Sequence, residues 1–452
     1  MPHVLSLAII LTLLLTGCSE DLSSNATTED AQISGSDASP LLEEGDGDWN
    51  KDGASTPTDI LREEQNRGDT NANADEDSTT PQADSSLSPP DSENIEEVDD
   101  AETTEDIETG EETSEVAEFL TLGEPIDASP LEWVWVPFPE TNCGDGSPTG
   151  LGINLSPGAT RALIYLEGGG ACWDWNTCFG LIPTSFHLSG YDEASFNGLL
   201  TQVYLNTLLF NREEPKNPLR DAHLVFIPYC TGDAHAGDRV LELSGLLPWE
   251  KEMMHFKGHS NLIQFLNRLV PTFSDVEHVV LAGGSAGGFG AGINWPWVAE
   301  AFQGQAGVDL LDDSGPPLEP AGDLWQTWVE SWGLVLPSGC PECADGLSAL
   351  LDHLRETVLL DNRMGLASYT HDPIISIFFT MLPSQFAGKL EELTAVFDAE
   401  AHAQYFILPG ALHTMTIGPG YELLESQDGM PLWFWIDQMI SDDPEWASHG
   451  PW

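Results

Sequence analysis

Residues 281–290 read Leu-Ala-Gly-Gly-Ser-Ala-Gly-Gly-Phe-Gly and contain the pattern Gly-x-Ser-x-Gly centred on Ser285. The apolar residues 279–281 predict a buried strand before the pattern, and residues 289–302 predict a helix after it. A sharp strand-to-helix turn of this kind holds a serine in a strained backbone conformation with its Oγ exposed, and the glycines let the backbone close up. The alternative interpretation is a glycine-rich strand-to-helix junction without catalytic function, which has a similar sequence in many α/β proteins. A nucleophilic role for Ser285 therefore requires a base, an acid and an oxyanion hole elsewhere in the chain.

Short apolar runs alternate with amphipathic segments on both sides of this turn. Alternating strands and helices predict a mostly parallel sheet with helices on both faces. With a nucleophile turn in the middle, this is an α/β-hydrolase-like architecture, and the Trp- and Leu-rich segments 324–336 and 431–446 are expected to be covering helices. The expected strands are residues 133–138, 162–166, 224–229, 279–281, 308–311, 364–369 and 404–408, and the expected helices are residues 261–270, 347–360 and 389–397.

The order nucleophile, acid, histidine along such a chain selects the other two catalytic candidates. His413 lies just after the expected last strand, where the fold places its base. Two acids compete. Asp372 ends the strand before His413, and Asp313 ends the first strand after Ser285. The later strand is the usual position, so we expect Asp372 to be the acid and Asp313 to be a structural carboxylate that hydrogen-bonds the active-site backbone.

An oxyanion hole needs two backbone N–H groups aimed at the developing negative charge. Ala286, directly after the serine, supplies one. Gly169 and Gly170 belong to a run of three glycines that follows an expected strand, and they supply the other. We therefore expect Ser285 Oγ to attack an ester carbonyl while His413 takes its proton, with water cleaving the acyl-enzyme afterwards. This chemistry calls for no metal and no cofactor.

The N-terminus predicts export. Residues 4–15 are apolar, too few to span a bilayer and of the length of a signal-peptide core. They lead into Leu15-Thr16-Gly17-Cys18, which resembles the lipobox of bacterial lipoproteins. We therefore expect residues 1–17 to be a signal peptide and acyl chains on Cys18 to anchor the protein to a membrane, favouring the outer membrane or cell surface, with the catalytic domain outside the cytoplasm. Because no Lys or Arg precedes the apolar run, an apolar stub with an unmodified cysteine is the alternative.

Charge divides the remainder into a tether and a domain. Residues 19–118 hold 32 acidic and three basic residues with no apolar period, which is the composition of a disordered, extended linker over residues 18–118. Residues 119–452 have the apolar content of one esterase-type domain, with 43 acidic and 11 basic residues. Such an acidic domain is not expected to bind nucleic acid, and we expect a monomer.

Cysteine usage also favours an exported protein. Seven cysteines are present, and six remain once the lipid-bearing Cys18 is set aside, an even number that predicts disulfides. A zinc site built on Cys340-Pro-Glu-Cys343 is the alternative, but no second ligand pair stands at metal spacing. Short loops suggest the pairs Cys172–Cys178 and Cys340–Cys343, which leaves Cys143–Cys230.

Several motifs, in order, resemble the pectin acetylesterase family, which includes Notum-like serine carboxylesterases. The resemblance covers about residues 135–416 and implies a secreted serine esterase of α/β-hydrolase fold. It assigns the triad to Ser285, Asp372 and His413, and it makes Asp312-Asp313-Ser314-Gly315 a structural segment. The motifs are residues 143–148 (Cys-Gly-Asp-Gly-Ser-Pro), 166–172 (Leu-Glu-Gly-Gly-Gly-Ala-Cys) with Cys178, 228–233 (Pro-Tyr-Cys-Thr-Gly-Asp) and 284–288 (Gly-Ser-Ala-Gly-Gly).

The resemblance leaves the substrate open. An acetylated polysaccharide is the leading expectation; the alternatives are a Notum-like deacylase of longer acyl esters, which needs a deep apolar pocket, and a non-catalytic surface lipoprotein of the same fold. Plant members have Trp where this chain has Ala171, and the interval from Ser285 to Asp372 is shorter than in Notum, which indicates a different pocket wall and a reduced lid. Four tryptophans are either core residues or a sugar-stacking platform: Trp173, Trp175, Trp325 and Trp328.

Overall fold

The computed structural model describes residues 117–417 and 420–452 of the 452-residue chain. The predicted signal peptide, the lipidation site Cys18 and nearly all of the acidic tether lie outside the described residues. Among the residues that are described, no helix is long and apolar enough to cross a membrane.

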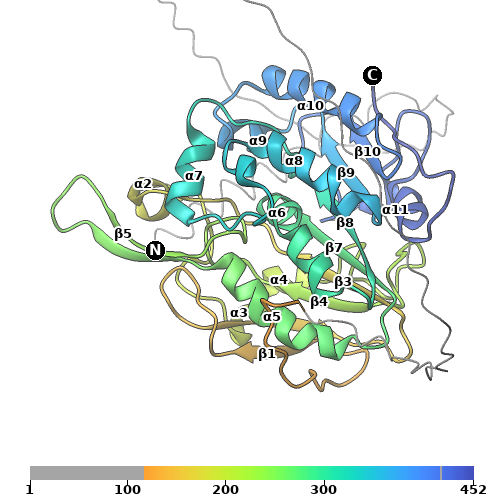
Figure 1. The fold of residues 1–452 in the computed structure, drawn as a ribbon, viewed down its shortest axis with the longest axis horizontal. Coiled ribbons are helices and arrows are strands. Elements are labelled where there is room, and N and C mark those ends of the chain that lie inside the picture. Colours follow the sequence, from red (N-terminus) through yellow and green to blue (C-terminus); the bar gives the residue numbers. More distant parts are fainter. Residues whose placement is uncertain (1–116, 418–419) are drawn as a thin grey trace, which may run out of the picture. The chain divides into compact units, whose positions relative to one another are not determined.

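An eight-stranded sheet forms the centre of the described domain (Figure 1), in the order β1-β2-β4-β3-β7-β8-β9-β10. The first two strands are antiparallel to each other, β2 is antiparallel to β4, and every pair from β4 to β10 is parallel. The predicted mostly parallel sheet is thus confirmed. The strands are β1 (Val134–Phe138), β2 (Thr149–Asn154), β3 (Arg161–Leu166), β4 (His223–Ile227), β7 (His278–Gly284), β8 (Gly307–Asp313), β9 (Met364–Tyr369) and β10 (Ala403–Leu408).

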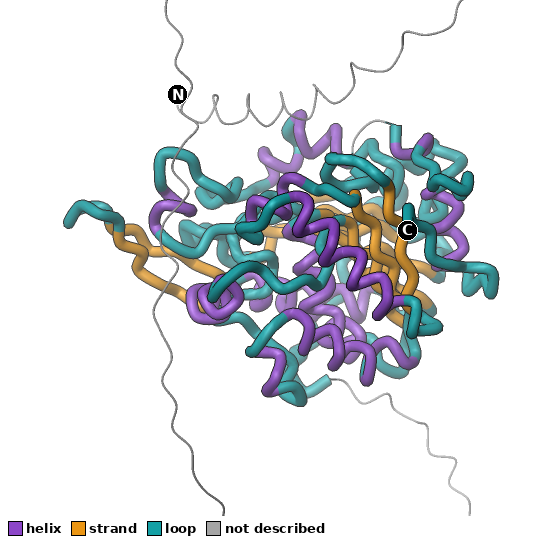
Figure 2. Tube along the Cα trace, turned by 90° about the horizontal axis from the view of Figure 1, so that it is seen from above, coloured by secondary structure: helices purple, strands orange, loops and turns teal. Residues whose placement is uncertain are grey.

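Helices cover both faces of the sheet (Figure 2), which is why its central strands are apolar without alternation. One core lies between the sheet and α5, α6, α8 and α10, and the other contains residues of α11. The helices are α2 (Trp175–Phe179), α3 (Glu193–Phe196), α4 (Leu199–Tyr204), α5 (Gly258–Thr272), α6 (Ala286–Ala301), α7 (Leu324–Trp332), α8 (Leu347–Glu356), α9 (Pro373–Phe378), α10 (Pro383–Phe397) and α11 (Leu432–Ile440).

The expected covering helices are present, as α7 and α11. A separate two-stranded hairpin, β5 (Arg239–Ser244) with β6 (Lys251–Phe256), was not predicted from the sequence. This hairpin follows β4 in the chain and projects from the body of the domain in both views (Figures 1 and 2). Its strands mix charged and apolar residues, so neither a period of two nor a period of 3.6 was visible in the sequence.

Candidate active site

Ser285 occupies a strained turn between β7 and α6. Its φ is 59° and its ψ is −123°, a combination that a residue with a side chain adopts only when its surroundings impose it. Crowding explains the neighbouring glycines: a Cβ on Gly283 would lie 2.1 Å from the oxygen of Gly287, and a Cβ on Gly287 would lie 2.0 Å from the oxygen of Leu166. The amide of Ser285 donates to the carbonyl of Asp313 at 2.8 Å, which ties the turn to the end of β8.

His413 and Asp372 form a hydrogen-bonded pair. Nδ1 of His413 lies 2.7 Å from Oδ2 of Asp372, whose side chain is fully buried. The other carboxylate oxygen, Oδ1, caps α9 by accepting the amides of Ile374 at 2.9 Å and Ile375 at 3.1 Å. The two carboxylate oxygens of Asp372 therefore have different partners, the N-terminus of α9 and the imidazole of His413. An imidazole that donates from Nδ1 presents its Nε2 lone pair, which is the form a general base requires.

The loop that carries His413 packs against the serine turn. A Cβ on Gly284 would lie 2.8 Å from Cδ1 of Ile417 and 3.6 Å from Cγ2 of Thr414, so a side chain there would displace Ile417. No hydrogen bond joins Ser285 Oγ to His413 or to any other residue that the structure describes. The serine hydroxyl and the imidazole are therefore on adjoining segments without a direct bond, and such bonds commonly tighten only when substrate is present.

Asp313, the competing acid, binds backbone rather than imidazole. Its carboxylate accepts the amides of Met415 at 2.8 Å and Thr416 at 2.7 Å, and the hydroxyl of Thr416 at 2.7 Å. Burial raises its pKa, while the bonds from Thr416 lower it. The neighbouring Asp312 accepts the amide of Gly315 at 2.7 Å, and burial raises the pKa of Asp312 to about 8. Both aspartates shape the loops around the site.

The glycine loop after β3 lies directly against the serine. A Cβ on Gly168 would lie 2.4 Å from the oxygen of Gly284 and 3.1 Å from Cβ of Ser285. Gly170 has a φ of +80°, and a Cβ there would lie 1.9 Å from the oxygen of Thr184. Within the described part of the chain, the amides of Gly169, Gly170 and Ala286 donate to no other residue. They are therefore available as donors beside the hydroxyl.

Glu167 supports this loop from inside, a role that the sequence analysis missed. Its Oε2 accepts the amide of Tyr229 at 3.0 Å, and its carbonyl accepts a hydrogen bond from Nε2 of His235 at 2.8 Å. Burial raises the pKa of Glu167 to about 8 and lowers the pKa of His235 to about 4. Burial therefore favours the uncharged form of both groups. The position of Glu167 directly before three glycines was the available signal.

An apolar cavity of about 40 Å³ opens beside Ser285 and continues into open solvent. Two indoles of α7 are fixed by backbone carbonyls: Trp325 Nε1 donates to Ala344 at 3.1 Å and Trp332 Nε1 to Cys172 at 2.7 Å. Trp325 and Trp328 are buried in the wall, so they cannot form an exposed sugar-stacking platform. The lining residues are Gly170, Ala171, Ala234, Ser285, Ala286, Phe289, Ile293, Trp325, Trp328, Trp332, Leu347, Ile375, Phe378 and Phe379.

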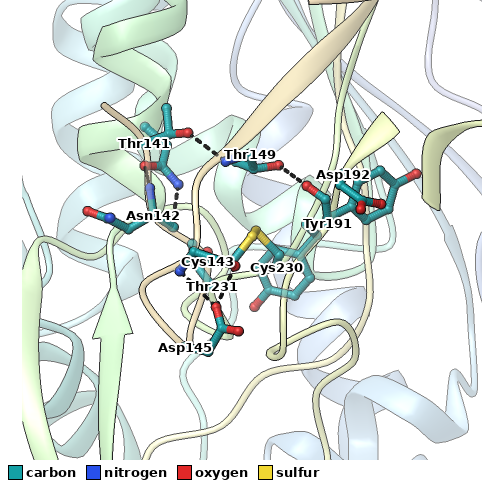
Figure 3. The surroundings of a disulfide bond; sticks show 12 residues. Thr141, Asn142, Cys143, Asp145, Thr149, Tyr191, Asp192, Cys230 and Thr231 are labelled. Carbon is teal, nitrogen blue, oxygen red and sulfur yellow. Dashed lines mark hydrogen bonds between the residues drawn. A yellow bond between two sulfur atoms is a disulfide. The ribbon is translucent and has the colours of Figure 1, made fainter. Parts of the chain in front are cut away.

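Three disulfides are present in the described domain, in the expected pairing. Cys143–Cys230 joins segments 87 residues apart and lies among hydrogen-bonded polar side chains (Figure 3). Cys172–Cys178 closes a short loop directly after the three glycines 168–170, and Cys340–Cys343 closes the turn after α7. Among residues 117–417 and 420–452, no cluster of three or more His, Cys, Asp or Glu side chains is placed to hold a metal ion.

The fold and this geometry define an α/β-hydrolase-like protein with a serine turn, a histidine–aspartate pair and a glycine loop at the carboxyl edge of one sheet. Residues 135–322 match the family model described as Pectinacetylesterase. The resemblance expected from the motifs is thus confirmed, and this segment of the chain is similar to the pectinacetylesterase family.

Known relatives carry the name palmitoleoyl-protein carboxylesterase. The human protein NOTUM is 30% identical over 179 residues, which are 38% of this chain and 34% of that protein. The zebrafish protein notum1a is 26% identical over 225 residues, which are 45% of this chain and 42% of its own. The chain thus spans about a third to two fifths of these relatives. A zebrafish relative described as inactive, notum1b, is 33% identical over 96 residues, covering 21% of this chain and 65% of its own.

The crystal structure of the Wnt deacylase Notum from Drosophila has the same fold. It superposes with a TM-score of 0.53 over 71% of this chain and 95% of that chain, at 18% sequence identity. At this identity the likeness concerns the fold alone. The existence of an inactive relative means that catalytic function must be argued from the site of this chain.

Proposed function

We propose that this protein is a serine carboxylesterase with Ser285 as nucleophile, His413 as base and Asp372 as acid. The observation that carries the proposal is the 2.7 Å bond from His413 Nδ1 to a buried aspartate, on a loop packed against a strained serine turn. A module kept only for binding has no use for this combination. The match of residues 135–322 to the pectinacetylesterase family model independently supports ester hydrolysis.

Catalysis then follows from the positions of these groups. Ser285 Oγ attacks the ester carbonyl and passes its proton to Nε2 of His413. Asp372 keeps the imidazole in the required tautomer and stabilises the imidazolium, while the amides of Gly169, Gly170 and Ala286 bind the oxyanion. The imidazolium then protonates the leaving alcohol. Water, deprotonated by His413, finally cleaves the acyl-enzyme.

Replacement of Ser285 tests this assignment. Ser285→Ala is expected to lower kcat on p-nitrophenyl esters by about 10⁴-fold or more and to abolish labelling by a fluorophosphonate probe. The matched control is Ser348→Ala, which removes an exposed hydroxyl on α8 and should change neither property. Undiminished labelling of Ser285→Ala would show that another residue is the nucleophile, and absent labelling of the parent would favour a non-catalytic lipoprotein.

The cavity favours an acyl group longer than acetyl. Its wall is almost entirely apolar and adjoins both Ser285 and the oxyanion amides, so an alkyl chain bound there would leave its carbonyl at the nucleophile. Deacetylation of an acetylated polysaccharide, the leading expectation from the sequence, needs apolar room only for a methyl group. We therefore propose a deacylase of medium or long acyl esters, with polysaccharide deacetylation as the second candidate supported by the family match.

A chain-length profile separates the two candidates. The parent is expected to hydrolyse octanoyl esters with a higher kcat/KM than acetyl esters, because each buried methylene contributes about 0.8 kcal/mol. Ala171→Trp fills the cavity wall and should reverse this preference, whereas Phe378→Ala widens the cavity and should extend it to longer chains. Activity confined to acetyl and propionyl esters, with acetate release from acetylated pectin or xylan, would instead support the polysaccharide candidate.

We also propose that the domain is exported and held to a membrane by acyl chains on Cys18, through the acidic tether. The support is a signal-like apolar run and a lipobox-like motif in the sequence, together with three disulfides in the described domain. Cys18→Ser should move the protein from the membrane fraction to the soluble fraction. Retention of that variant in the membrane after high-salt and carbonate washes would contradict a lipid anchor.

A further inference from the structure

Six large apolar residues are exposed on segments at the catalytic edge of the sheet. They lie on segments that leave the carboxyl ends of the parallel strands β3, β4, β9 and β10, and Ser285 follows the carboxyl end of β7 between them. Parallel strands end at one edge of a sheet, so these segments share that edge. Their side chains are 49–102% exposed, and we call them the apolar rim: Leu181, Ile182, Leu246, Trp249, Ile377 and Leu412.

The tip of the β5–β6 hairpin is a hydrogen-bonded turn. The amide of Gly245 donates to the carbonyl of Glu250 at 2.7 Å, and the carboxylate of Glu250 accepts the amide of Leu247 at 2.8 Å. These bonds hold Leu246 and Trp249 outward in water. Exposed apolar patches of this kind mark interaction sites in soluble proteins.

The tip is also connected to the catalytic edge. A Cβ on Gly245 would lie 2.8 Å from Cδ2 of Trp175, so the turn rests on α2. Helix α2 lies within the Cys172–Cys178 loop that follows the oxyanion glycines, and Leu181 and Ile182 come directly after it. The strand β5 contacts α7, whose tryptophans line the cavity. The hairpin that carries Leu246 and Trp249 is therefore in contact with elements next to the cavity.

We propose that the apolar rim seats this protein on a neutral lipid bilayer, so that an acyl chain passes from the bilayer into the cavity beside Ser285. The inference rests on the proposed function, because it assigns the cavity to the acyl chain. Trp and Leu side chains partition into the membrane interface, and the rim presents them at the catalytic edge of the sheet. The chain carries 75 acidic against 14 basic residues, so anionic head groups repel it and a zwitterionic surface is the fitting partner.

Two forms of substrate test this inference on the full chain carrying Cys18→Ser, in which no lipid anchor contributes. The double variant Leu246→Ser/Trp249→Ser should match the parent within about twofold in kcat/KM on dispersed p-nitrophenyl butyrate. On p-nitrophenyl dodecanoate held in phosphatidylcholine vesicles its rate should fall about ten-fold or more, because two apolar anchors are lost. The control Leu360→Ser removes a leucine that is 64% exposed and precedes β9 at the opposite edge of the sheet, and it should change neither rate.

Binding provides a readout that needs no catalysis. In flotation with phosphatidylcholine vesicles, the Ser285→Ala form should bind, and adding the two rim substitutions should lower the bound fraction about ten-fold, whereas adding Leu360→Ser should not. Equal vesicle binding and equal vesicle rates for parent and rim variant would overturn the inference. So would a rim variant that turns a dimeric parent into a monomer, since the rim would then bind a second copy. Loss of activity of the parent on dispersed ester would instead contradict the proposed function itself.

Discussion

The ends of β8 and β9 each deliver a buried aspartate to the same loop, yet the two carboxylates do different work. At the end of β9, Asp372 divides its oxygens between the first amides of α9 and the imidazole of His413. At the end of β8, Asp313 has both oxygens occupied by donors from the backbone and hydroxyl that follow His413. Burial is complete at both positions.

The difference shows that burial and acidity do not identify a catalytic carboxylate. What distinguishes the two is the oxygen left for the imidazole. Asp313 is saturated by fixed donors and can only hold the loop in place, which makes it a positioning residue. Asp372 has one oxygen that a helix N-terminus orients and one that remains for His413. The following variants test this division of labour, beginning with the largest expected effect.

Asp372→Asn should lower kcat by about 10³–10⁴-fold. The amide oxygen can still cap α9 by accepting the amide of Ile374, so the fold should persist. The NH₂ group then faces Nδ1 of His413 and donates to it, which moves the imidazole proton to Nε2 and removes the base. Steady-state kinetics on a p-nitrophenyl ester, with circular dichroism to verify folding, provide the measurement. A loss below ten-fold would remove Asp372 from the proposed triad.

Asp313→Asn should destabilise the protein by about 1–3 kcal/mol and lower kcat by only about ten-fold. Asparagine offers one acceptor oxygen in place of two, so the amides of Met415 and Thr416 compete for it and the loop of His413 loosens. Urea unfolding and kcat measured on the same preparation separate the two effects. If this variant lost more activity than Asp372→Asn, the roles of the two aspartates would have to be exchanged.

The end of β8 should also give the stability a pH dependence through Asp312. Burial raises its pKa from 3.8 to about 8, so between these values the folded protein holds a proton that the unfolded chain has released. The contribution of Asp312 to the free energy of unfolding is therefore greatest below about pH 4. As the pH rises to about 8, this contribution falls by at most about 1.4 kcal/mol per pH unit. Asp312→Asn cannot titrate and keeps an oxygen for the amide of Gly315.

Urea unfolding between pH 5 and pH 8 measures this slope. The Asp312→Asn protein should lose less stability with rising pH than the parent, while Asp352→Asn, at an exposed carboxylate on α8, should follow the parent. Buried Asp313 and Glu167 also have raised pKa values, so both proteins keep part of the slope. Identical slopes for parent and Asp312→Asn would mean that Asp312 is ionised in the folded protein.

Much of the framework could be predicted because the sequence pattern is local there. The glycines around Ser285 and those before Ala171 report backbone crowding directly, since any side chain at Gly283 or Gly287 would overlap a carbonyl. The parallel strands are continuous apolar runs because helices cover both faces. Chain order then places His413 and Asp372 on the last two strands, and the structure brings them to 2.7 Å of each other.

The parts that could not be predicted depend on contacts between distant segments. Two aspartates at two strand ends look alike in sequence, and only the position of Thr416, about a hundred residues after Asp313, reveals which oxygens are occupied. The cavity is assembled from residues of α6, α7, α9 and the glycine loop, so no single segment of the sequence predicts it. The hairpin tip at Leu246 and Trp249 gave no periodic signal, because its apolar residues face water.

The smallest effect is expected from Thr416→Val, which removes a single donor from Asp313. The hydroxyl of Thr416 donates to Oδ2 at 2.7 Å and is buried, while the amides of Met415 and Thr416 remain in place after the exchange. One lost hydrogen bond should cost about 1 kcal/mol in urea unfolding and leave kcat within about twofold. The hydroxyl lowers the pKa of Asp313, so its removal raises that pKa further and should make the fall of stability with rising pH steeper. The control Ser376→Ala removes a hydroxyl that donates to the backbone carbonyl of Asp372 and not to its carboxylate. This variant should lose a similar free energy of unfolding without a steeper dependence of stability on pH. If Thr416→Val lowered kcat a hundred-fold, Asp313 would be acting on the imidazole as well as on the loop, and the contrast between the two strand ends would fail.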